Sequence, residues 1–348
     1  MYRYYFLFPL MLIIYVSGSA QTSLVEEDLQ RYTSGVLAEQ VAHFSEGDLH
    51  YAGLVVQETS TGNVIANVSL IYKDSRFISG EPNTTPFPTP LGRALLYMCI
   101  MSDAKNANMV IDTQGGVHTD SEGQVIRDHN AAHGGYGMCD LLHAFIGNSD
   151  VGMIKGAEIA FQKDARKLAV KINRSGILFG GIASETYGRW DSYALLGYRN
   201  SSISLLESTA WLTAVAGGSF VIRLTASDPS DPYDEIDKDG RKSLMRAMRM
   251  HVTEGLGRSM NSDLPVAGLT NVSPETDEGY RSFFAAAVMP YSEDSLPKYT
   301  IGIQIVSKGS ARPATAIKKI VDYLYFRDLI SAKKVAQAHH RRLHPAAR

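Results

Sequence analysis

The chain of 348 residues is poor in cysteine and tryptophan, with two of each, and its charges nearly cancel. Two cysteines cannot build the disulfide framework on which small secreted domains depend. With 34 basic and 36 acidic residues the formal net charge is −2, so the chain lacks the overall basic field that attracts nucleic acid. No internal repeat and no long low-complexity segment occurs, which argues against a repeat architecture.

The N-terminus carries an apolar run that ends in small residues. It begins with Arg3, continues from Phe6 to Val16 and closes with Ser17-Gly18-Ser19-Ala20. This is the pattern of a secretory signal peptide over residues 1–20. The apolar core is shorter than the roughly 20 residues of a membrane span, which favours cleavage after Ala20. The sequence therefore predicts an exported, periplasmic or extracytoplasmic protein, with an uncleaved membrane anchor as the alternative.

The rest of the chain has the composition of a globular protein, with 45% hydrophobic and 20% charged residues. Apolar residues recur at helical spacing in some segments and form β-branched runs in others. Helices are predicted over residues 26–44, 93–102, 138–146, 151–161, 204–216, 241–256 and 315–325. Strands are predicted over residues 53–58, 63–72, 265–270, 282–289 and 300–306, with a loop over 77–90.

The last residues, 327–348, are basic and are expected to form a frayed, solvated tail. The alternative is a contact between this tail and an anionic polymer or lipid surface, because it holds several lysines, arginines and histidines. Cys99 and Cys139 are interpreted as two buried thiols on helices, and a disulfide between them is the alternative in an exported protein.

No metal and no cofactor is expected. His129 and His133 have the spacing of a helical zinc site, but they precede Gly134-Gly135 in a predicted loop. The acidic stretch from Pro229 to Gly240 lacks the regular alternation of a calcium loop, so it is interpreted as a solvated excursion.

A series of short motifs follows one order between about Leu24 and Phe326. They are Asp28-Leu29-Gln30, Tyr51-Ala52-Gly53-Leu54-Val55-Val56, Thr61-Gly62-Asn63-Val64-Ile65-Ala66, Pro90-Leu91-Gly92, Ile126-Arg127-Asp128, Gly134-Gly135-Tyr136-Gly137, Gly147-Asn148-Ser149-Asp150-Val151, Leu196-Gly197-Tyr198, Ala216-Gly217-Gly218, Val266-Ala267-Gly268-Leu269-Thr270-Asn271-Val272 and Phe283-Phe284. In this order, they resemble the transpeptidase domain of the penicillin-binding proteins, the serine D,D-transpeptidase and β-lactamase-like family. The resemblance implies an α+β fold over residues 21–326, with an antiparallel sheet flanked by helices and an all-helical lobe.

The first catalytic motif of that family is lost. The family places a Ser after the Pro-Gly turn and a Lys three residues later, where this chain has Arg93 and Leu96. That spacing puts both side chains on one helical face, so that a neutral Lys takes the proton of the attacking Ser. A guanidinium has no nucleophilic oxygen and stays charged, because its pKa is roughly 12 or more. Leu96 offers no base.

The second and third motifs are altered too. Asn148 and Asp150 lie where the family writes Ser-Ser-Asn-Val, whose polar residues contact the catalytic Lys and the substrate. Leu269, Thr270 and Asn271 lie where the family has Lys-Thr-Gly, which grips the substrate carboxylate. Leu269 cannot pair with a carboxylate, and Asn271 adds a side chain where Gly lets substrate approach the backbone. The resemblance therefore implies that no catalytic residue except the threonine is retained.

The function expected from this resemblance is that of a pseudoenzyme with a binding or scaffolding role, and with peptidoglycan or cell-wall synthesis proteins as partners. One alternative is an active D,D-transpeptidase or carboxypeptidase-type acyl transferase that acts on peptidoglycan stem peptides with a relocated nucleophile, such as Ser102 or Ser149. The segment Ser102-Asp103-Ala104-Lys105 matches the Ser-x-x-Lys pattern, but out of register. The other alternative is a scaffold unrelated to peptidoglycan.

Arg93 requires an anionic neighbour if it is buried. A cation in the first turn of a helix opposes the helix dipole, and burial without a partner costs several kcal/mol more. In the fold that the resemblance implies, the second motif faces the first. We therefore predict a contact between Arg93 and Asp150, with an Arg93 that points to solvent as the alternative.

Overall fold

The computed structural model describes residues 26–45, 47–73, 76–79, 83, 86–88, 91–173, 190–198, 202–217, 237–275, 279–288 and 296–343. The predicted signal peptide, Pro90, Gly218 and most of the acidic stretch from Pro229 lie outside these residues. Among the helices of the described ranges, none is both long and apolar enough to cross a bilayer.

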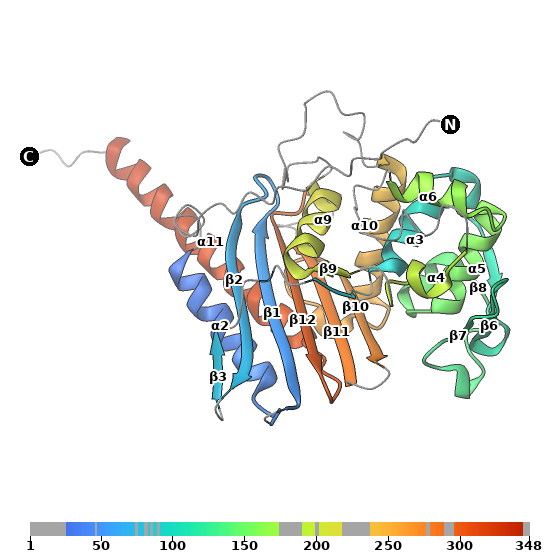
Figure 1. Ribbon diagram of the computed structural model, residues 1–348. Coiled ribbons are helices and arrows are strands. Elements are labelled where there is room, and N and C mark those ends of the chain that lie inside the picture. The colour runs from blue at the N-terminus through green and yellow to red at the C-terminus, as the bar shows by residue number, and fades with distance from the viewer. Residues whose placement is uncertain are drawn as a thin grey trace, which may run out of the picture.

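A six-stranded antiparallel sheet forms the centre of the molecule (Figure 1). Its strands lie in the order β10-β11-β12-β1-β2-β3. Their bounds are Leu49–Glu58 for β1, Val64–Lys73 for β2, Arg76–Ser79 for β3, Val266–Glu275 for β10, Gly279–Val288 for β11 and Tyr299–Ser307 for β12. The first two strands form the predicted hairpin, whereas β12 reaches β1 from the far end of the chain. The sheet therefore joins both ends of the described chain.

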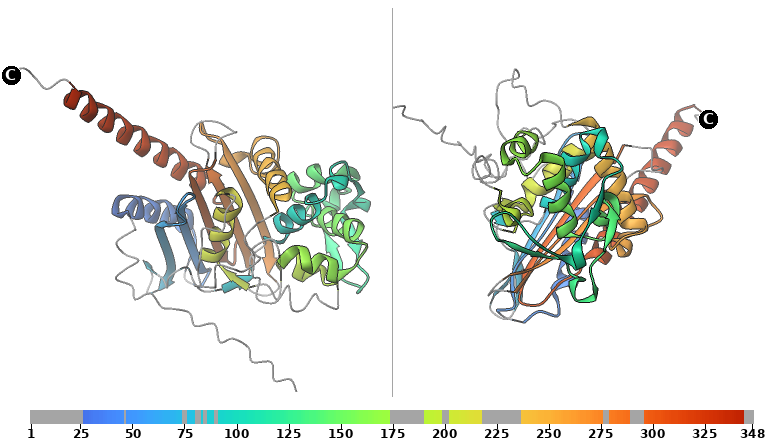
Figure 2. Two further views of the ribbon diagram at one scale, coloured as in Figure 1. Left: turned by 90° about the horizontal axis from the view of Figure 1, so that it is seen from above. Right: turned by 90° about the vertical axis from the view of Figure 1, so that its right-hand side faces the viewer.

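Helices cover both faces of the sheet (Figure 2). Successive side chains of a strand point to opposite faces, so neighbouring residues of β1 pack against different layers. Gln57 faces α9 (Leu205–Gly217), where its side-chain oxygen accepts a 2.8 Å hydrogen bond from Thr213. Val56 belongs to the core formed with α2 (Glu27–Val41) and α11 (Ala314–Leu343). The sheet is thus the middle of three layers.

A second lobe lies beside the β10 edge of the sheet (Figure 1). Its helices are α3 (Gly92–Met101), α4 (Leu141–Ile146), α5 (Asp150–Phe161) and α6 (Ala165–Asn173), and α10 (Lys238–Thr253) connects it with the sheet. Two antiparallel ribbons also occur there, β5 (Val110–Asp112) with β8 (Met138–Asp140), and β6 (Val117–Thr119) with β7 (Val125–Arg127). The expectation of an all-helical lobe is therefore corrected.

The predicted helix over residues 138–146 starts later than expected. Met138–Asp140 pairs as a strand, and the Asp140 carboxylate accepts a 2.7 Å hydrogen bond from the backbone N–H of His143. An acidic side chain in this capping position ends the strand and begins α4. The predicted loop over residues 77–90 is also corrected, because it contains part of β3 and all of β4 (Pro86–Pro88), which pairs with β9 (Ser202–Ser204).

The last helix is much longer than the sequence indicated. It was expected over residues 315–325 with a frayed tail after it, but α11 continues to Leu343. The apolar residues that pack on the sheet end near Leu324, and the expectation followed that apolar pattern. The backbone continues as a helix because no glycine or proline interrupts residues 314–343. The division of the chain at residue 326 remains a prediction.

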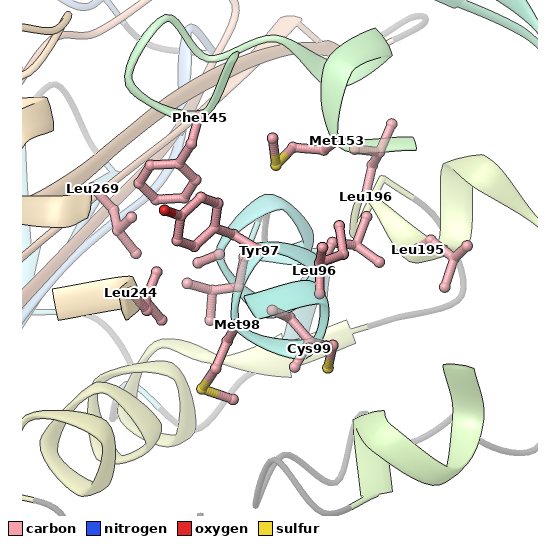
Figure 3. Packing of buried hydrophobic residues seen from close by; sticks show 14 of the residues in the cluster. Leu96, Tyr97, Met98, Cys99, Phe145, Met153, Leu195, Leu196, Leu244 and Leu269 are labelled. Atoms are coloured by element: carbon pink, nitrogen blue, oxygen red, sulfur yellow. The ribbon is translucent and has the colours of Figure 1, made fainter. Parts of the chain in front are cut away.

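Helix α3 lies at the centre of the larger hydrophobic cluster (Figure 3). Nearly every residue of α3 is buried, as its all-round apolar sequence predicted. Cys99 is buried on this helix as predicted, and both cysteines are free thiols. Cys139 is only partly buried and lies on strand β8, so its predicted burial on a helix is corrected.

Candidate functional site

The candidate site lies where the start of α3, the turn between α4 and α5, and strand β10 meet. Gly92 opens α3 against the backbone that follows α8 (Ser192–Leu195). A Cβ on Gly92 would lie 2.0 Å from the backbone oxygen of Leu195 and 2.3 Å from the backbone carbon of Leu196. Only glycine permits this approach. It brings the first turn of α3, with Arg93, close to the segment that carries Tyr198.

Arg93 is buried and paired with Asp150. The two side chains meet at 2.7 Å between Nη1 of Arg93 and Oδ1 of Asp150, the first residue of α5. Both are almost fully shielded from solvent, at 8% and 11% side-chain exposure. The predicted contact is therefore confirmed, and the alternative of a solvent-exposed Arg93 is wrong.

Tyr198 completes the ion pair from the other side. Its hydroxyl donates a 2.5 Å hydrogen bond to Oδ2 of Asp150, so that each carboxylate oxygen has a donor. Burial raises the pKa of Tyr198 first, and the negative charge of Asp150 raises it further, which keeps the phenol protonated. Burial alone would lower the pKa of Arg93, but the charges of Asp150, Tyr198 and Asp128 and the hydrogen bond to Asp150 together outweigh this effect, and the pKa lies above its ordinary value. Arg93 thus stays a cation.

Hydrogen bonds link this pair to the other two motifs. The side-chain amide of Asn148 donates to the backbone oxygen of Thr270 on β10 over 3.0 Å, and Nη2 of Arg93 donates to the same oxygen over 3.3 Å. Asn148 adopts a left-handed backbone with φ of 58°, which asparagine tolerates better than most residues. Arg93, Asn148, Asp150 and Thr270 are therefore brought together from three separate parts of the chain.

The remaining motif positions are Leu96, Leu269 and Asn271, and the two leucines lie outside this polar network. Leu96 and Leu269 are both in the hydrophobic cluster around α3, where Figure 3 shows them among packed side chains. Asn271 is buried, and its amide lies near the phenol of Tyr198, whose pKa it lowers slightly against the effect of burial. That these positions correspond to the catalytic residues of the family stays a prediction from the sequence.

His251 on α10 makes a contact that the sequence did not indicate. Its Nδ1 lies 2.9 Å from the backbone oxygen of Ile146, and its Nε2 lies 2.8 Å from the hydroxyl of Thr270. A carbonyl oxygen only accepts, so the proton is on Nδ1 and the Thr270 hydroxyl donates to Nε2. Burial lowers the pKa of His251 to about 4, which keeps the imidazole neutral. No motif or spacing in the sequence could have found this residue.

The pH dependence of stability follows from this buried imidazole. The folded protein disfavours a protonated His251, whereas the unfolded chain binds a proton at the ordinary pKa of about 6.5. The unfolded state therefore holds more protons between pH about 6.5 and about 4, and stability falls as the pH is lowered through this window. We expect His251→Gln to reduce the slope of the unfolding free energy against pH between 4 and 6.5, measured by urea unfolding. An unchanged slope would contradict the assignment.

Ser149, one of the two proposed relocated nucleophiles, has a structural role. It is fully buried and caps α5, where its hydroxyl donates to Oδ2 of Asp128 over 2.7 Å and accepts from the N–H of Gly152 over 2.8 Å. Burial raises the pKa of Asp128, and the hydrogen bonds from Ser149 and from the N–H of Val151 oppose this rise. The sequence places Asp128 in a motif but does not indicate its hydrogen bonds with Ser149 and Val151.

Ser102, the other proposed nucleophile, lies at the far end of α3. Its hydroxyl donates to the backbone oxygen of Cys99 over 2.8 Å. Lys105, which completes the Ser-x-x-Lys pattern, pairs with Asp103 at 2.8 Å instead. The two residues of the pattern thus have separate partners, the backbone of Cys99 for Ser102 and the carboxylate of Asp103 for Lys105.

The hydroxyl of Thr270 is in contact with the imidazole of His251, which could act as its base. A base with a pKa of about 4 is poorly matched to proton abstraction near neutral pH. Thr270 and His251 are also almost completely shielded, at 9% and 1% exposure. The contact between Thr270 and His251 therefore holds β10 against α10, and it is poorly suited to activate the Thr270 hydroxyl as a nucleophile. Among the residues that the structure describes, no three His, Cys, Asp or Glu side chains are grouped to hold a metal ion.

Comparison with known proteins finds this fold among solved structures. No protein-family model and no curated protein matches the sequence. A peptidoglycan glycosyltransferase from Burkholderia ambifaria is 14% identical and aligns over 89% of this chain and 97% of its own, with a TM-score of 0.64. Penicillin-binding protein 3 from Mycobacterium tuberculosis is 15% identical over 88% of this chain and 79% of its own, with a TM-score of 0.66. The transpeptidase domain of the FtsI4 D,D-transpeptidase from Legionella pneumophila is 15% identical over 86% and 96%, with a TM-score of 0.57.

These likenesses show that the chain has the α+β fold of penicillin-binding protein transpeptidase domains, as the order of the sequence motifs predicted.

Proposed function

We propose that this protein is a catalytically inactive member of the penicillin-binding protein transpeptidase class, which binds peptidoglycan or the proteins that synthesise it, outside the cytoplasm. The peptidoglycan context is supported by the similar structures, which are a peptidoglycan glycosyltransferase and penicillin-binding proteins. The N-terminal apolar segment supports export.

The buried pair of Arg93 and Asp150 carries the proposal. The sequence motifs predict that this cation replaces the nucleophile of the family, and three hydrogen bonds hold its guanidinium in place. A guanidinium neither attacks a carbonyl nor accepts a proton. Leu96 and Leu269, which the sequence motifs predict at the positions of the two family lysines, are buried among apolar side chains. The buried side chains at these positions pair or pack with their neighbours and supply neither a nucleophile nor a base. This favours a binding protein over an enzyme.

An active acyl transferase is the second candidate, and the Thr270–His251 contact is the observation in its favour. Two observations weigh against it. The imidazole is a weak base, with a pKa of about 4, and both groups are nearly inaccessible. Ser102 and Ser149 are engaged with the main chain and with Asp128, respectively.

The proposal predicts binding to purified sacculi without acylation by a fluorescent penicillin. No labelled band is expected after denaturing electrophoresis, because the β-lactam adduct requires a nucleophilic hydroxyl beside a base. The protein is expected to sediment with the sacculi.

An active penicillin-binding protein in the same gel provides the control for the label. A boiling-resistant, stoichiometric adduct on this chain would establish the acyl-transferase alternative. Absence of both the adduct and binding to sacculi would favour a scaffold unrelated to peptidoglycan.

A further inference from the structure

Strand β10 is the outermost strand on one side of the central sheet. Among the described strands it pairs with β11 alone, and Figure 1 shows the second lobe beside its other edge. The free edge of such a strand carries backbone N–H and C=O groups that can pair with a further strand. Proteins that bind extended peptides use edges of this kind, because main-chain hydrogen bonds supply the affinity. The state of the β10 edge therefore decides whether this chain can bind a peptide there.

Alternate residues of β10 direct their backbone groups to the free edge. In an antiparallel pair a residue either exchanges both hydrogen bonds with its neighbour or points both groups away from it. The backbone oxygen of Thr270 accepts hydrogen bonds from Arg93 and Asn148 of the second lobe, so Thr270 points away from β11. The register with β11 runs without a shift from Val266 to Glu275. The period of two therefore gives the same direction to residues 266, 268, 272 and 274.

Side chains of the same chain occupy two of these outward carbonyl groups. The oxygen of Thr270 accepts two hydrogen bonds, at 3.3 Å from Nη2 of Arg93 and at 3.0 Å from the amide of Asn148. A carbonyl oxygen has two lone pairs, so this group has no acceptor capacity left for an added strand. Four residues earlier, the oxygen of Val266 accepts a 3.2 Å hydrogen bond from Nη1 of Arg249 on α10. The donor side chains thus lie where the backbone of an added strand would lie.

A proline interrupts the same edge beyond these contacts. Pro274 lies opposite Tyr280 of β11, at one of the outward positions. Proline has no backbone N–H, so it is tolerated in a strand where its nitrogen faces away from the neighbouring strand. At the free edge it removes a donor that an added strand would need. Proline at an edge is one of the devices by which proteins prevent further strand pairing.

We propose that the free edge of β10 is closed to strand pairing by an internal contact, in which Arg93, Asn148 and Arg249 take the place of a bound peptide. The buried pair with Asp150 holds the guanidinium of Arg93 in this position, so a peptide would have to displace an ion-paired side chain. This inference deepens the proposed function and rests on it for the choice of partner. It excludes the peptide stems of peptidoglycan at this edge, so binding to sacculi should use another surface.

Fluorescence anisotropy with a fluorescein-labelled peptidoglycan stem pentapeptide tests the proposal. The wild-type protein is expected to bind this probe with a Kd weaker than about 1 mM. An excess of unlabelled pentapeptide should leave sedimentation with sacculi unchanged. A protein that does not sediment with sacculi at all would contradict the proposed function, whereas the anisotropy experiment would still report on the β10 edge.

One variant opens the edge at its contact with the second lobe. Arg93→Met/Asp150→Leu/Asn148→Gly removes both donors from the oxygen of Thr270. It leaves no unpaired buried charge, and glycine readily adopts the left-handed backbone of residue 148. The variant is expected to bind the pentapeptide at least about tenfold more tightly than the wild type, because main-chain hydrogen bonds become available.

A second variant opens the edge without changing the buried ion pair. Arg249→Met/Pro274→Thr releases the oxygen of Val266 and supplies the missing N–H, so a gain in affinity is expected here too. Lys242→Met is the control, because it removes a cation from the exposed part of α10 and should bind no more tightly than the wild type. Circular dichroism confirms that each variant is folded.

Three outcomes would overturn the proposal. They are wild-type binding with a Kd below about 1 mM, no gain in a folded variant with an opened edge, and an equal gain in the Lys242 control. The last result would assign the gain to lost positive charge. If the first variant does not fold, the second decides the question, because it keeps the pair of Arg93 and Asp150.

Discussion

Replacing Arg93 with methionine is expected to lower the free energy of unfolding by about 3–5 kcal/mol. The substitution leaves the carboxylate of Asp150 buried without a cation, and breaking a buried pair from one side costs this much. The hydroxyl of Tyr198 still donates to Asp150, but a neutral donor does not compensate a buried charge. Urea unfolding followed by circular dichroism measures the change.

An exposed ion pair provides the matched control. Lys105 and Asp103 are 2.8 Å apart, close to the 2.7 Å of Arg93 and Asp150, but their side chains are 70% and 45% exposed. Lys105→Met should therefore change the stability by less than about 1 kcal/mol.

The double variant Arg93→Met/Asp150→Leu should cost clearly less than the sum of the two single changes, because no unpaired charge remains. Additive effects, or a loss at Arg93 no larger than that at Lys105, would show that the buried pair is not coupled.

Gly92→Ala is expected to destabilise the fold by about 3 kcal/mol or more. The added Cβ would lie 2.0 Å from the backbone oxygen of Leu195, and backbone cannot move aside as a flexible side chain can. Forcing even one extra carbon into a packed interior typically costs 1–3 kcal/mol, and here the obstacle is main chain. Because α3 must shift, the Arg93–Asp150 contact should also weaken.

Gly35 is the control for this substitution. It is exposed within α2, and a Cβ there would meet nothing within 4 Å. Gly35→Ala should stabilise the protein by about 0.4–1 kcal/mol, since alanine favours the helix and restricts the unfolded chain. Opposite signs at the two glycines, measured by thermal and urea unfolding, are the expected result. Equal and small effects would contradict the close approach at Gly92.

The order of the motifs was sufficient to predict the fold because each motif records a local requirement. Gly92 marks a helix that begins against other backbone, and Thr61-Gly62 marks the turn between β1 and β2. Helical and strand periods located most elements for the same reason, since they report which side of one element is buried. The errors lie where this local signal is weak, at the short ribbons of the lobe and in α11 beyond Leu324.

For the candidate site, the sequence alone established that Arg93 and Leu96 supply neither a nucleophile nor a base, and that a buried Arg93 needs an anion. Its partner, Asp150, could be named only because the resemblance supplied a fold in which the two motifs face each other. The contact joins residues 57 positions apart.

Only the tertiary structure decided the rest of the network. The hydrogen bond from Tyr198 to Asp150 spans 48 positions, that from Arg93 to the backbone of Thr270 spans 177, and the contact of His251 with Thr270 joins a helix to a strand. The period of a helix or strand shows which side is buried, but not which side chain of another element will meet it. That choice depends on how α3, α5, α10 and β10 pack together, and it is made by sterics and by the need to pair every buried polar group.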